Sequence, residues 1–234
     1  MRKVVLIIQA RMSSKRLPGK MFKDIAGIPL YKYVYRRCQQ AKGVDKVILA
    51  TSIDISDNPL FESAIKDEFN VYRGPLDNVL KRYVSCAKKA GAKIIIRICG
   101  DSPFVDIRMI EELISHLIEN NLEYVCLQKH KCVYGLDSEV VTLSTLEKIL
   151  KLTNQPDDIE HVTCYIRKNP QNFKTKCLEY DLDPFDGNIS LTVDTADDLK
   201  FCNRVAKGLV EKIGSYKFDF TTKDIFNIIE NIKH

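Results

Sequence analysis

The chain lacks several of the features that most quickly assign a protein to a class. Its 234 residues contain no tryptophan, and no apolar run approaches the roughly 18 residues that a membrane-spanning helix needs. Neither glycine-rich phosphate-binding signature occurs, because both G-x-x-x-x-G-K-S/T and G-x-G-x-x-G are missing. These absences predict a protein without membrane-spanning helices that uses neither a P-loop nor the usual dinucleotide fingerprint.

The cysteines lack the spacing of a metal site. There are eight, scattered without a C-x-x-C pair and without a histidine at zinc spacing. No signal peptide is visible, since Arg2 and Lys3 are followed by only a short apolar stretch. We therefore expect a cytoplasmic protein with free thiols, most of them in the core. No cysteine has a visible activating partner, so a catalytic thiol is not indicated.

A strong excess of charge is also absent. The formal net charge is +5, and the hydrophobic content of 45% is ordinary for a globular protein. Nucleic-acid binding is disfavoured because the charge is modest and no basic segment is interleaved with aromatic residues. The length predicts one domain with a sizeable core.

The pattern that is present is an alternation of strands and helices. Apolar, largely β-branched runs at residues 4–8, 44–51 and 92–99 predict strands that are buried on both faces. Amphipathic segments between them predict helices, which together give right-handed βαβ units. The predicted fold class is α/β, with a Rossmann-like, mostly parallel sheet and helices on both faces.

The second half of the chain alternates strands and helices less regularly. We predict that residues 1–127 and 189–234 form a nucleotide-binding core, within one continuous domain overall. Residues 128–188 are predicted to form an inserted mixed α/β lobe for the acceptor or for dimerisation, where substrate sites often lie. Within this lobe we expect a helix over 157–167. We also expect a strand over 188–193, followed by a long helix to about residue 213 that Thr195 and the residues up to Asp198 cap.

The loop after the first strand is rich in basic and small residues. Arg11, Arg16 and Lys20 follow the strand closely, with Ser13 and Ser14 between them. Guanidinium, ammonium, hydroxyl and backbone N–H groups all bind phosphate oxygens. The loop is therefore a candidate anion site, and a solvated basic surface loop is the alternative.

Two aspartates follow strong strands in the same way. Asp101 stands in Gly100-Asp101-Ser102 after one strand, and Asp194 follows another. In an open parallel sheet, ligands gather beyond the carboxyl ends of the strands. Mg²⁺ is usually held by one or two carboxylates with phosphate and water oxygens, so this pair is a candidate metal site. The alternative is a local turn or capping role for each aspartate.

Six segments together resemble a known family. The loop QARMSSKRLPGK resembles the signature of the sugar-activating cytidylyltransferases, most closely the spore-coat polysaccharide branch and more distantly the CMP-Kdo and CMP-sialic acid synthetases. GDSP, VDT, RGPLDNVLKRY, YGLDSE and EHVT resemble further motifs of that family. Two departures stand out: Ser14-Lys15-Arg16 replaces a common Ser-Thr-Arg, and Tyr134 stands where an acid is common. The resemblance runs from residue 7 to residue 201.

The resemblance implies a fold of the nucleotide-diphospho-sugar transferase type, and it implies roles for particular residues. Asp101 and Asp194 would hold Mg²⁺, and Arg11, Arg16, Lys20 and Asp101 would act in catalysis. The implied contacts to CTP are Gln9, Ala10, Arg11, Ser13, Ser14, Arg16, Lys20, Arg73 and Gly100. The implied contacts to the acceptor are Asp137, Glu139, Glu160 and His161.

For several of these residues the sequence leaves a structural alternative. Helix capping is the alternative for Asp77 and Glu160, and a satisfied, partly buried imidazole is the alternative for His161. Arg82 matches a family position but has an ion pair as its alternative. Arg97 interrupts an apolar strand, and a buried arginine rarely lacks a partner, so we expect a salt bridge there.

The expected function is nucleotidyl transfer. An oxygen of an acidic sugar, or of a sugar or polyol phosphate, would attack the α-phosphorus of CTP and release pyrophosphate, for surface polysaccharide biosynthesis. Glycosyl transfer or use of another nucleotide on the same fold is one alternative. A non-catalytic nucleotide-binding scaffold is another. A homodimer is typical of the resembling enzymes and is left open here.

Overall fold

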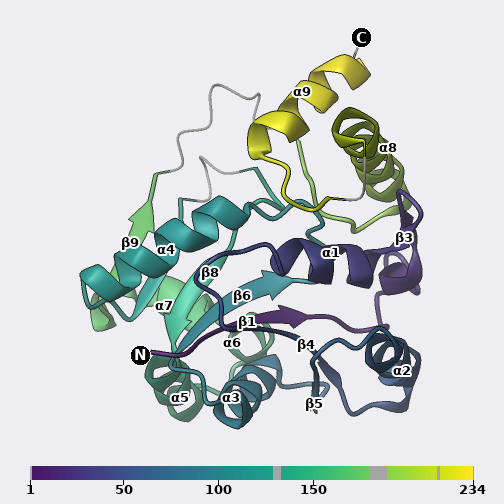
Figure 1. The fold of residues 1–234 in the computed structure, drawn as a ribbon. Helices are drawn as coiled ribbons and strands as arrows, with labels where there is room; N and C mark the ends of the chain where they lie inside the picture. The colour runs from purple at the N-terminus through teal and green to yellow at the C-terminus, as the bar shows by residue number, and fades with distance from the viewer. Residues whose placement is uncertain (1, 129–132, 180–188, 215–216, 234) are drawn as a thin grey trace.

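The centre of the molecule is a single mixed sheet between two layers of helices (Figure 1). A computed structural model describes residues 2–128, 133–179, 189–214 and 217–233. In this part of the chain seven strands lie in the order β5-β4-β1-β6-β8-β7-β9. The strands are β1 Val4–Gln9, β4 Lys46–Ser52, β5 Val71–Gly74, β6 Ile94–Cys99, β7 Tyr124–Leu127, β8 Glu139–Thr142 and β9 Thr175–Leu178.

The direction of the strands confirms the predicted fold class. Strands β1, β4, β5 and β6 pair in parallel, and β7 pairs in parallel with β9. Among the described strands of this sheet, β8 alone runs antiparallel to its neighbours, between β6 and β7. The described parts of residues 128–188 therefore supply β8 and β9 to the same sheet.

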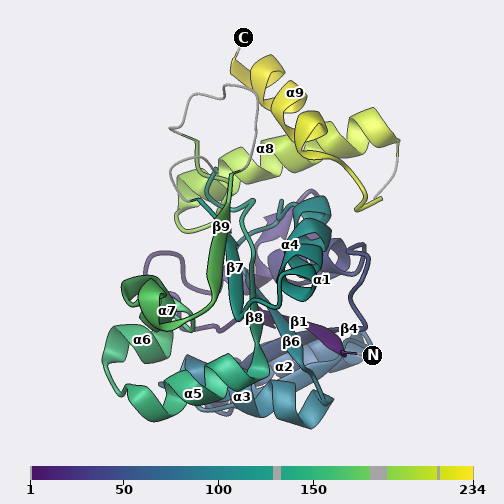
Figure 2. The ribbon, with the colours of Figure 1, turned by 90° about the vertical axis from the view of Figure 1, so that its left-hand side faces the viewer.

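Helices cover both faces of the sheet (Figures 1 and 2). Helices α1, α4 and α8 pack on one face, and α3 and α5 pack on the other. A short hairpin, β2 Asp24–Ile25 with β3 Ile28–Pro29, precedes α1. The helices are α1 Leu30–Cys38, α2 Asn58–Lys66, α3 Val79–Ala90, α4 Ile107–Glu119, α5 Leu143–Leu152, α6 Pro156–Glu160, α7 Cys164–Lys168, α8 Ala196–Ile213 and α9 Thr222–Lys233.

Strand β1 is buried on both faces, as its apolar run predicts. Leu6 and Ile8 belong to the core cluster beneath α1 and α4, while Val5 and Ile7 belong to the cluster beneath α3. All four side chains are fully buried, and each such burial contributes about 1.5–3 kcal/mol. The end of β1, where the basic loop begins, is therefore a firmly held part of the molecule.

The residues that cap two helices can be compared with those that the sequence suggested. Thr195 and Asp198 form a capping box at the start of α8. Helix α3 is capped by the side chain of Asn78, which accepts from the Lys81 N–H. The alternative of a capping role for Asp77 is therefore wrong, because its neighbour performs that role.

The predicted helix over residues 157–167 is wrong, because the chain forms two short helices, α6 and α7, with a break between them. His161 has φ −103° and ψ 67°, values that do not continue an α-helix. Glu160 and His161 thus stand at a corner of the backbone. Of the strand predicted over 188–193, residue 188 lies outside the described residues, and Ser190 makes an isolated parallel bridge with Tyr134.

Candidate nucleotide and acceptor site

A cavity of about 610 Å³ opens at the carboxyl ends of β1 and β6. Six cationic side chains and three carboxylates are found among the described residues that line it. Most of the predicted site residues lie on its wall: Gln9, Ala10, Arg11, Ser13, Ser14, Arg16, Lys20, Gly100, Asp101, Glu160, His161 and Asp194. Arg73, Asp137 and Glu139 are the predicted residues that do not.

Lys20 joins the two predicted metal-binding aspartates. Its Nζ lies 2.7 Å from Asp101 Oδ2 and 3.1 Å from Asp194 Oδ1, and it also donates to the Val193 carbonyl. Burial alone would lower the pKa of Lys20, but the two carboxylates outweigh burial, so this pKa is raised. The ammonium is therefore held charged at the floor of the cavity.

The backbone around this cluster depends on glycine. A Cβ at Gly100 would lie 2.8 Å from the Gln9 carbonyl oxygen and 3.0 Å from Ala10 Cβ, so a side chain there would force the ends of β6 and β1 apart. Gly19 has φ +66°, a conformation that favours glycine, and it starts the turn that carries Lys20. The signature loop is thus shaped by its glycine as well as by its charges.

The loop arginines are paired with acidic residues across the cavity. Arg11 forms a two-point contact with Glu160, at 2.8 Å and 3.4 Å, and Arg16 lies 2.9 Å from Asp194. The Arg16 side chain is 68% exposed, and an exposed ion pair contributes about 0–1 kcal/mol. The Arg11 side chain is also 40% exposed, so both arginines can exchange these partners for a phosphate at little cost.

Asp57 is a site residue that the sequence did not reveal. Its fully buried carboxylate accepts from the Met12 N–H at 2.6 Å, from the Ser52 N–H at 3.0 Å and from the Ser52 hydroxyl. It therefore ties the basic loop to the end of β4. In the sequence, Asp57 resembles an ordinary helix-start residue, and its burial is visible only in the fold.

The two arginines at 73 and 82, both in the RGPLDNVLKRY segment, donate hydrogen bonds to backbone carbonyls nearby. Arg73 donates to the carbonyls of Ser52 and Asp54, at 2.7 Å and 2.9 Å. Arg82 is 1% exposed and donates to the carbonyls of Pro75 and Leu76, rather than to the carboxylate that was its alternative. The contact between Arg73 and the nucleotide stays a prediction, while Arg82 lines the cavity.

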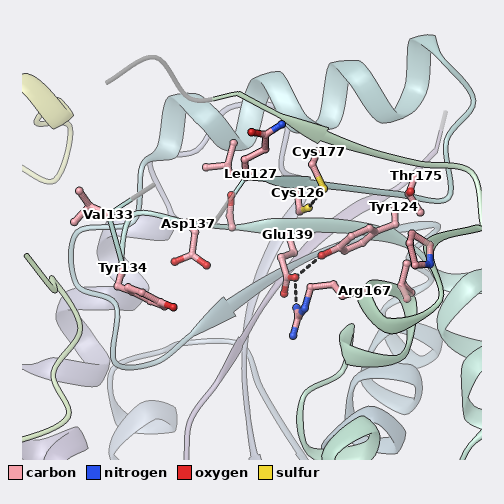
Figure 3. A pocket seen from close by; sticks show the side chains of 14 residues that line it. Tyr124, Cys126, Leu127, Val133, Tyr134, Asp137, Glu139, Arg167, Thr175 and Cys177 are labelled. Atoms are coloured by element: carbon pink, nitrogen blue, oxygen red, sulfur yellow. Dashed lines mark hydrogen bonds and ion pairs between the residues drawn. The ribbon is translucent and has the colours of Figure 1, made fainter. Parts of the chain in front are cut away.

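Figure 3 shows a second cavity, of about 430 Å³, which shares the residue Tyr134 with the first. Asp137 and Glu139 lie on its wall, and Tyr134 lines both cavities. The departure from the family pattern at Tyr134 therefore falls at the boundary between the two spaces.

Glu139 forms the most heavily bonded cluster of the second cavity. Its oxygens lie 2.6 Å from an Arg97 nitrogen and 2.5 Å from an Arg167 nitrogen, and they accept from the hydroxyls of Tyr124 and Thr163. The predicted salt bridge of Arg97 is thus confirmed. Burial would raise the pKa of Glu139, but the two arginines and the hydrogen bonds lower it to about 2.

Some polar atoms on the cavity walls lack a partner among the described residues. Gln9 Oε1 and Arg97 Nε are buried, unbonded and located at the first cavity. Buried polar atoms in proteins are almost always hydrogen-bonded. A bound ligand is one way in which this acceptor and this donor gain partners.

The thiols of the described residues are unbridged, as the sequence predicts. Burial raises the pKa values of Cys38, Cys86, Cys99 and Cys202 to about 12. Cys99 lines the first cavity, but a thiol with so high a pKa is a poor nucleophile. The chemistry of the site therefore rests on cations and carboxylates.

Comparisons with known proteins show which family the chain belongs to. The model of the cytidylyltransferase family matches residues 5–218. The spore coat polysaccharide biosynthesis protein SpsF of Bacillus subtilis is 32% identical over 219 residues, which cover 92% of this chain and 89% of SpsF. A cytidylyltransferase from Leptospira borgpetersenii superposes with a TM-score of 0.87 at 28% identity, covering 100% of this chain and 96% of that one.

A more distant structure shares the fold alone. CMP:2-keto-3-deoxy-manno-octonic acid synthetase in complex with CTP superposes with a TM-score of 0.66 at 20% identity, covering 86% of this chain and 97% of that one.

The family match and the similarity to SpsF show that the chain belongs to the cytidylyltransferase family. It is a CTP-dependent nucleotidyltransferase. No described helix is long and apolar enough to cross a membrane.

Proposed function

We propose that the protein transfers CMP from CTP to an acidic sugar, or to a sugar or polyol phosphate, and releases pyrophosphate. The observation that carries this proposal is the cluster of Lys20 with Asp101 and Asp194, set in a cavity where cationic side chains outnumber carboxylates. A triphosphate and a divalent cation together complement such a set of charges. The product would serve surface polysaccharide biosynthesis, a role that the name of the SpsF relative supports.

Triphosphate binding follows from an exchange of ion pairs. Arg11 and Arg16 now contact Glu160 and Asp194, on the cavity wall. Phosphate oxygens would replace those carboxylates and accept from the same guanidinium groups, in the two-point geometry that arginine favours. Ser13 and Ser14 would add hydroxyl donors from the same loop. The basic loop thus binds the β- and γ-phosphates and stabilises the charge that leaves as pyrophosphate.

Asp101 and Asp194 fit a divalent cation. Their oxygens already surround one positive charge, the Lys20 ammonium. Two carboxylates at one point, beside space for phosphate and water oxygens, form the donor set that Mg²⁺ accepts. A bound Mg²⁺ would neutralise charge on the phosphates and polarise the α-phosphate.

The reaction needs little covalent chemistry from the protein. An acceptor oxygen forms a bond to the α-phosphorus while the bond from that phosphorus to the bridging oxygen of pyrophosphate breaks. An attacking carboxylate or phosphate oxygen carries no proton and requires no general base, whereas an attacking sugar hydroxyl would pass its proton to the solvent as it bonds to phosphorus. The protein contributes orientation and charge neutralisation, through Arg11, Arg16 and Lys20.

The acceptor would approach from the side of the second cavity. Glu160 and His161 stand on the first cavity at the corner between α6 and α7, and Asp137 and Glu139 line the adjoining space. Because the oxygens of Glu139 are already bonded to four groups of the protein, we propose that it positions the wall. Asp137 is the better candidate for a direct contact to the acceptor.

Substitution of the two aspartates tests the proposal. Asp101→Asn and Asp194→Asn are each expected to abolish pyrophosphate release with CTP while leaving the thermal unfolding temperature close to that of the parent protein. Asp197→Asn is a matched control, because this side chain is 91% exposed and is predicted to leave the rate unchanged. Rates near the parent value in either test variant would overturn the metal assignment.

A further inference from the structure

The loop that is proposed to bind the triphosphate has little regular structure of its own. Residues 10–19 are all described, and they form neither a helix nor a strand. Ser13, Lys15 and Arg16 are exposed. Exposed segments of this kind sample several conformations unless contacts from outside hold them in place. The groups that would bind phosphate therefore need an anchor.

Asp57 supplies an anchor at the centre of the phosphate-binding side chains. Its Oδ1 accepts from the Met12 N–H at 2.6 Å, and Met12 stands between Arg11 and Ser13. Hydrogen bonds to an ionised carboxylate are shorter than those between neutral groups and about twice as strong. This bond therefore fixes the backbone from which the side chains on both sides of Met12 project.

The other oxygen of the carboxylate is bonded to the sheet. Oδ2 accepts from the Ser52 N–H at 3.0 Å and from the Ser52 hydroxyl. Ser52 is the last residue of β4 and is fully buried, and its carbonyl accepts from Arg73 of β5 at 2.7 Å. Asp57 thus places Met12 relative to two strands of the sheet.

The side chain of Asp57 does not serve the helix that it precedes. Asp57 is the residue before α2, which packs against β4 and β5 (Figure 1), yet its side chain makes no capping hydrogen bond to that helix. The residue is fully buried, and burial of a carboxylate is costly unless hydrogen bonds satisfy it. The bonds that satisfy this one run to the loop and to β4, so an anchor explains the buried charge and a helix cap does not.

Asp57 also lies away from the space for the ligand. It is not among the described residues that line the first cavity, whereas Arg11, Ser13 and Ser14 are. Any effect of Asp57 on a bound triphosphate would therefore pass through Met12 and the loop.

We infer that Asp57 is a positioning residue for the triphosphate. Its carboxylate holds the Met12 N–H, so that Arg11, Ser13 and Ser14 face the first cavity together before CTP arrives. A loop that is ordered in advance binds more tightly, because binding no longer has to order it. This role rests on the proposed function, which names the triphosphate as the ligand of the loop.

Calorimetry with CTP and with CMP tests this role on the whole protein. Asp57→Asn keeps the size of the side chain but replaces one acceptor oxygen by a donor, so it cannot accept from both Met12 and Ser52. We expect CTP to bind about tenfold more weakly than to the parent protein. CMP should bind within about twofold of its parent affinity, since it lacks the outer phosphates that the loop is proposed to contact.

Hydrogen exchange followed by mass spectrometry reports on the loop itself. Without nucleotide, peptides that contain residues 11–14 should exchange faster in Asp57→Asn than in the parent protein, because the Met12 N–H loses its acceptor. Saturating CTP should restore part of the protection. This measurement needs neither an acceptor nor turnover.

Asp106→Asn is the matched control. Asp106 is 6% exposed, and its carboxylate accepts from the N–H groups of Arg108 and Met109 and from the Thr222 hydroxyl. Two N–H groups and one hydroxyl also hold Asp57, but Asp106 is not among the described residues that line the first cavity. This control should lower the melting temperature and leave both the CTP affinity and the exchange of the loop unchanged. A merely structural role for Asp57 would make the two variants behave alike.

Ser52→Ala is a milder variant that serves if Asp57→Asn does not fold. It removes the hydroxyl donor to Oδ2, keeps the bond to Met12, and should weaken CTP binding about threefold without changing CMP binding. Parent-like CTP affinity in the variant that folds, equal losses for CTP and CMP, or unchanged exchange of the loop would each overturn the inference. A parent protein that binds no CTP would overturn the proposed function, and the inference with it, before any variant is compared.

Discussion

Substitution of Glu139 should lower the free energy of unfolding by an amount that can be worked out from the structure. The side chain is 6% exposed and neutralises Arg97 and Arg167 together. Glu139→Gln keeps the shape but leaves the guanidinium groups of Arg97 and Arg167, whose side chains are 13% and 27% exposed, without this counter-charge. Removing one partner of a buried pair typically costs about 3–5 kcal/mol. For a chain of this length, that corresponds to a fall in melting temperature of about 6–20 °C.

The pKa of Glu139 gives a second, independent value for the contribution of this carboxylate to stability. The value falls from 4.5 to about 2 in the folded protein, and at about 1.36 kcal/mol per unit this amounts to about 3 kcal/mol. Because the folded pKa is the lower one, the contribution is present above pH 4.5 and is lost as the pH falls toward 2. This contribution agrees with the cost expected for removing one partner of the ion pairs.

Urea denaturation at pH 7 and at pH 3 measures both effects. The parent protein should lose part of its free energy of unfolding between these pH values through Glu139, and Glu139→Gln should lack that part of the loss. Glu147→Gln is the matched control, because its ion pair with Lys88 is exposed and should cost about 1 kcal/mol or less. Equal losses of unfolding free energy for the two substitutions at pH 7 would show that Glu139 does not neutralise Arg97 and Arg167.

Three further predictions concern the loop, the strand ends and the thiols. Arg16→Ala should weaken CTP binding in calorimetry about tenfold while CMP binding changes little, because the side chain is proposed to contact the outer phosphates; equal losses would contradict that role. Gly100→Ala should destabilise the fold by about 1–3 kcal/mol in urea denaturation, because its Cβ would lie 2.8 Å from the Gln9 carbonyl oxygen; an unchanged free energy of unfolding would contradict that close approach. Diamide should oxidise Cys126 and Cys177 to a disulfide by taking up their two thiol hydrogens, because the two sulfurs lie 2.9 Å apart on paired strands. Intact-mass spectrometry would show the loss of two hydrogens from the protein, and Cys177→Ser should abolish this loss.

The parts of the fold that the sequence predicted are those with a local signal. The apolar run of β1 specified a strand buried on both faces, and Thr195 with Asp198 specified the start of α8. The helix break at His161 escaped prediction because residues 157–167 contain neither proline nor glycine to interrupt the pattern. The direction of β8 also escaped, because a strand's sequence does not state which way it runs.

The site was predictable in its residues but not in its pairings. Motifs placed Lys20, Asp101 and Asp194 in one site, and the cavity brings them together. The ammonium that lies between the two carboxylates joins residues 174 positions apart, and nothing local encodes such a contact. The same holds for the buried carboxylate of Asp57, which resembles a surface residue until the fold encloses it.

Pyrophosphate release is the most direct test of CMP transfer from CTP. The assay would combine the protein with Mg²⁺, each of the four ribonucleoside triphosphates in turn, and a panel of acidic sugars and sugar or polyol phosphates. We expect pyrophosphate release with CTP and an acceptor together, and none with CTP alone. Faster release with another nucleotide would show that the protein does not transfer CMP. No release with any acceptor, together with no triphosphate raising the melting temperature, would show that the cavity is not a nucleotide site.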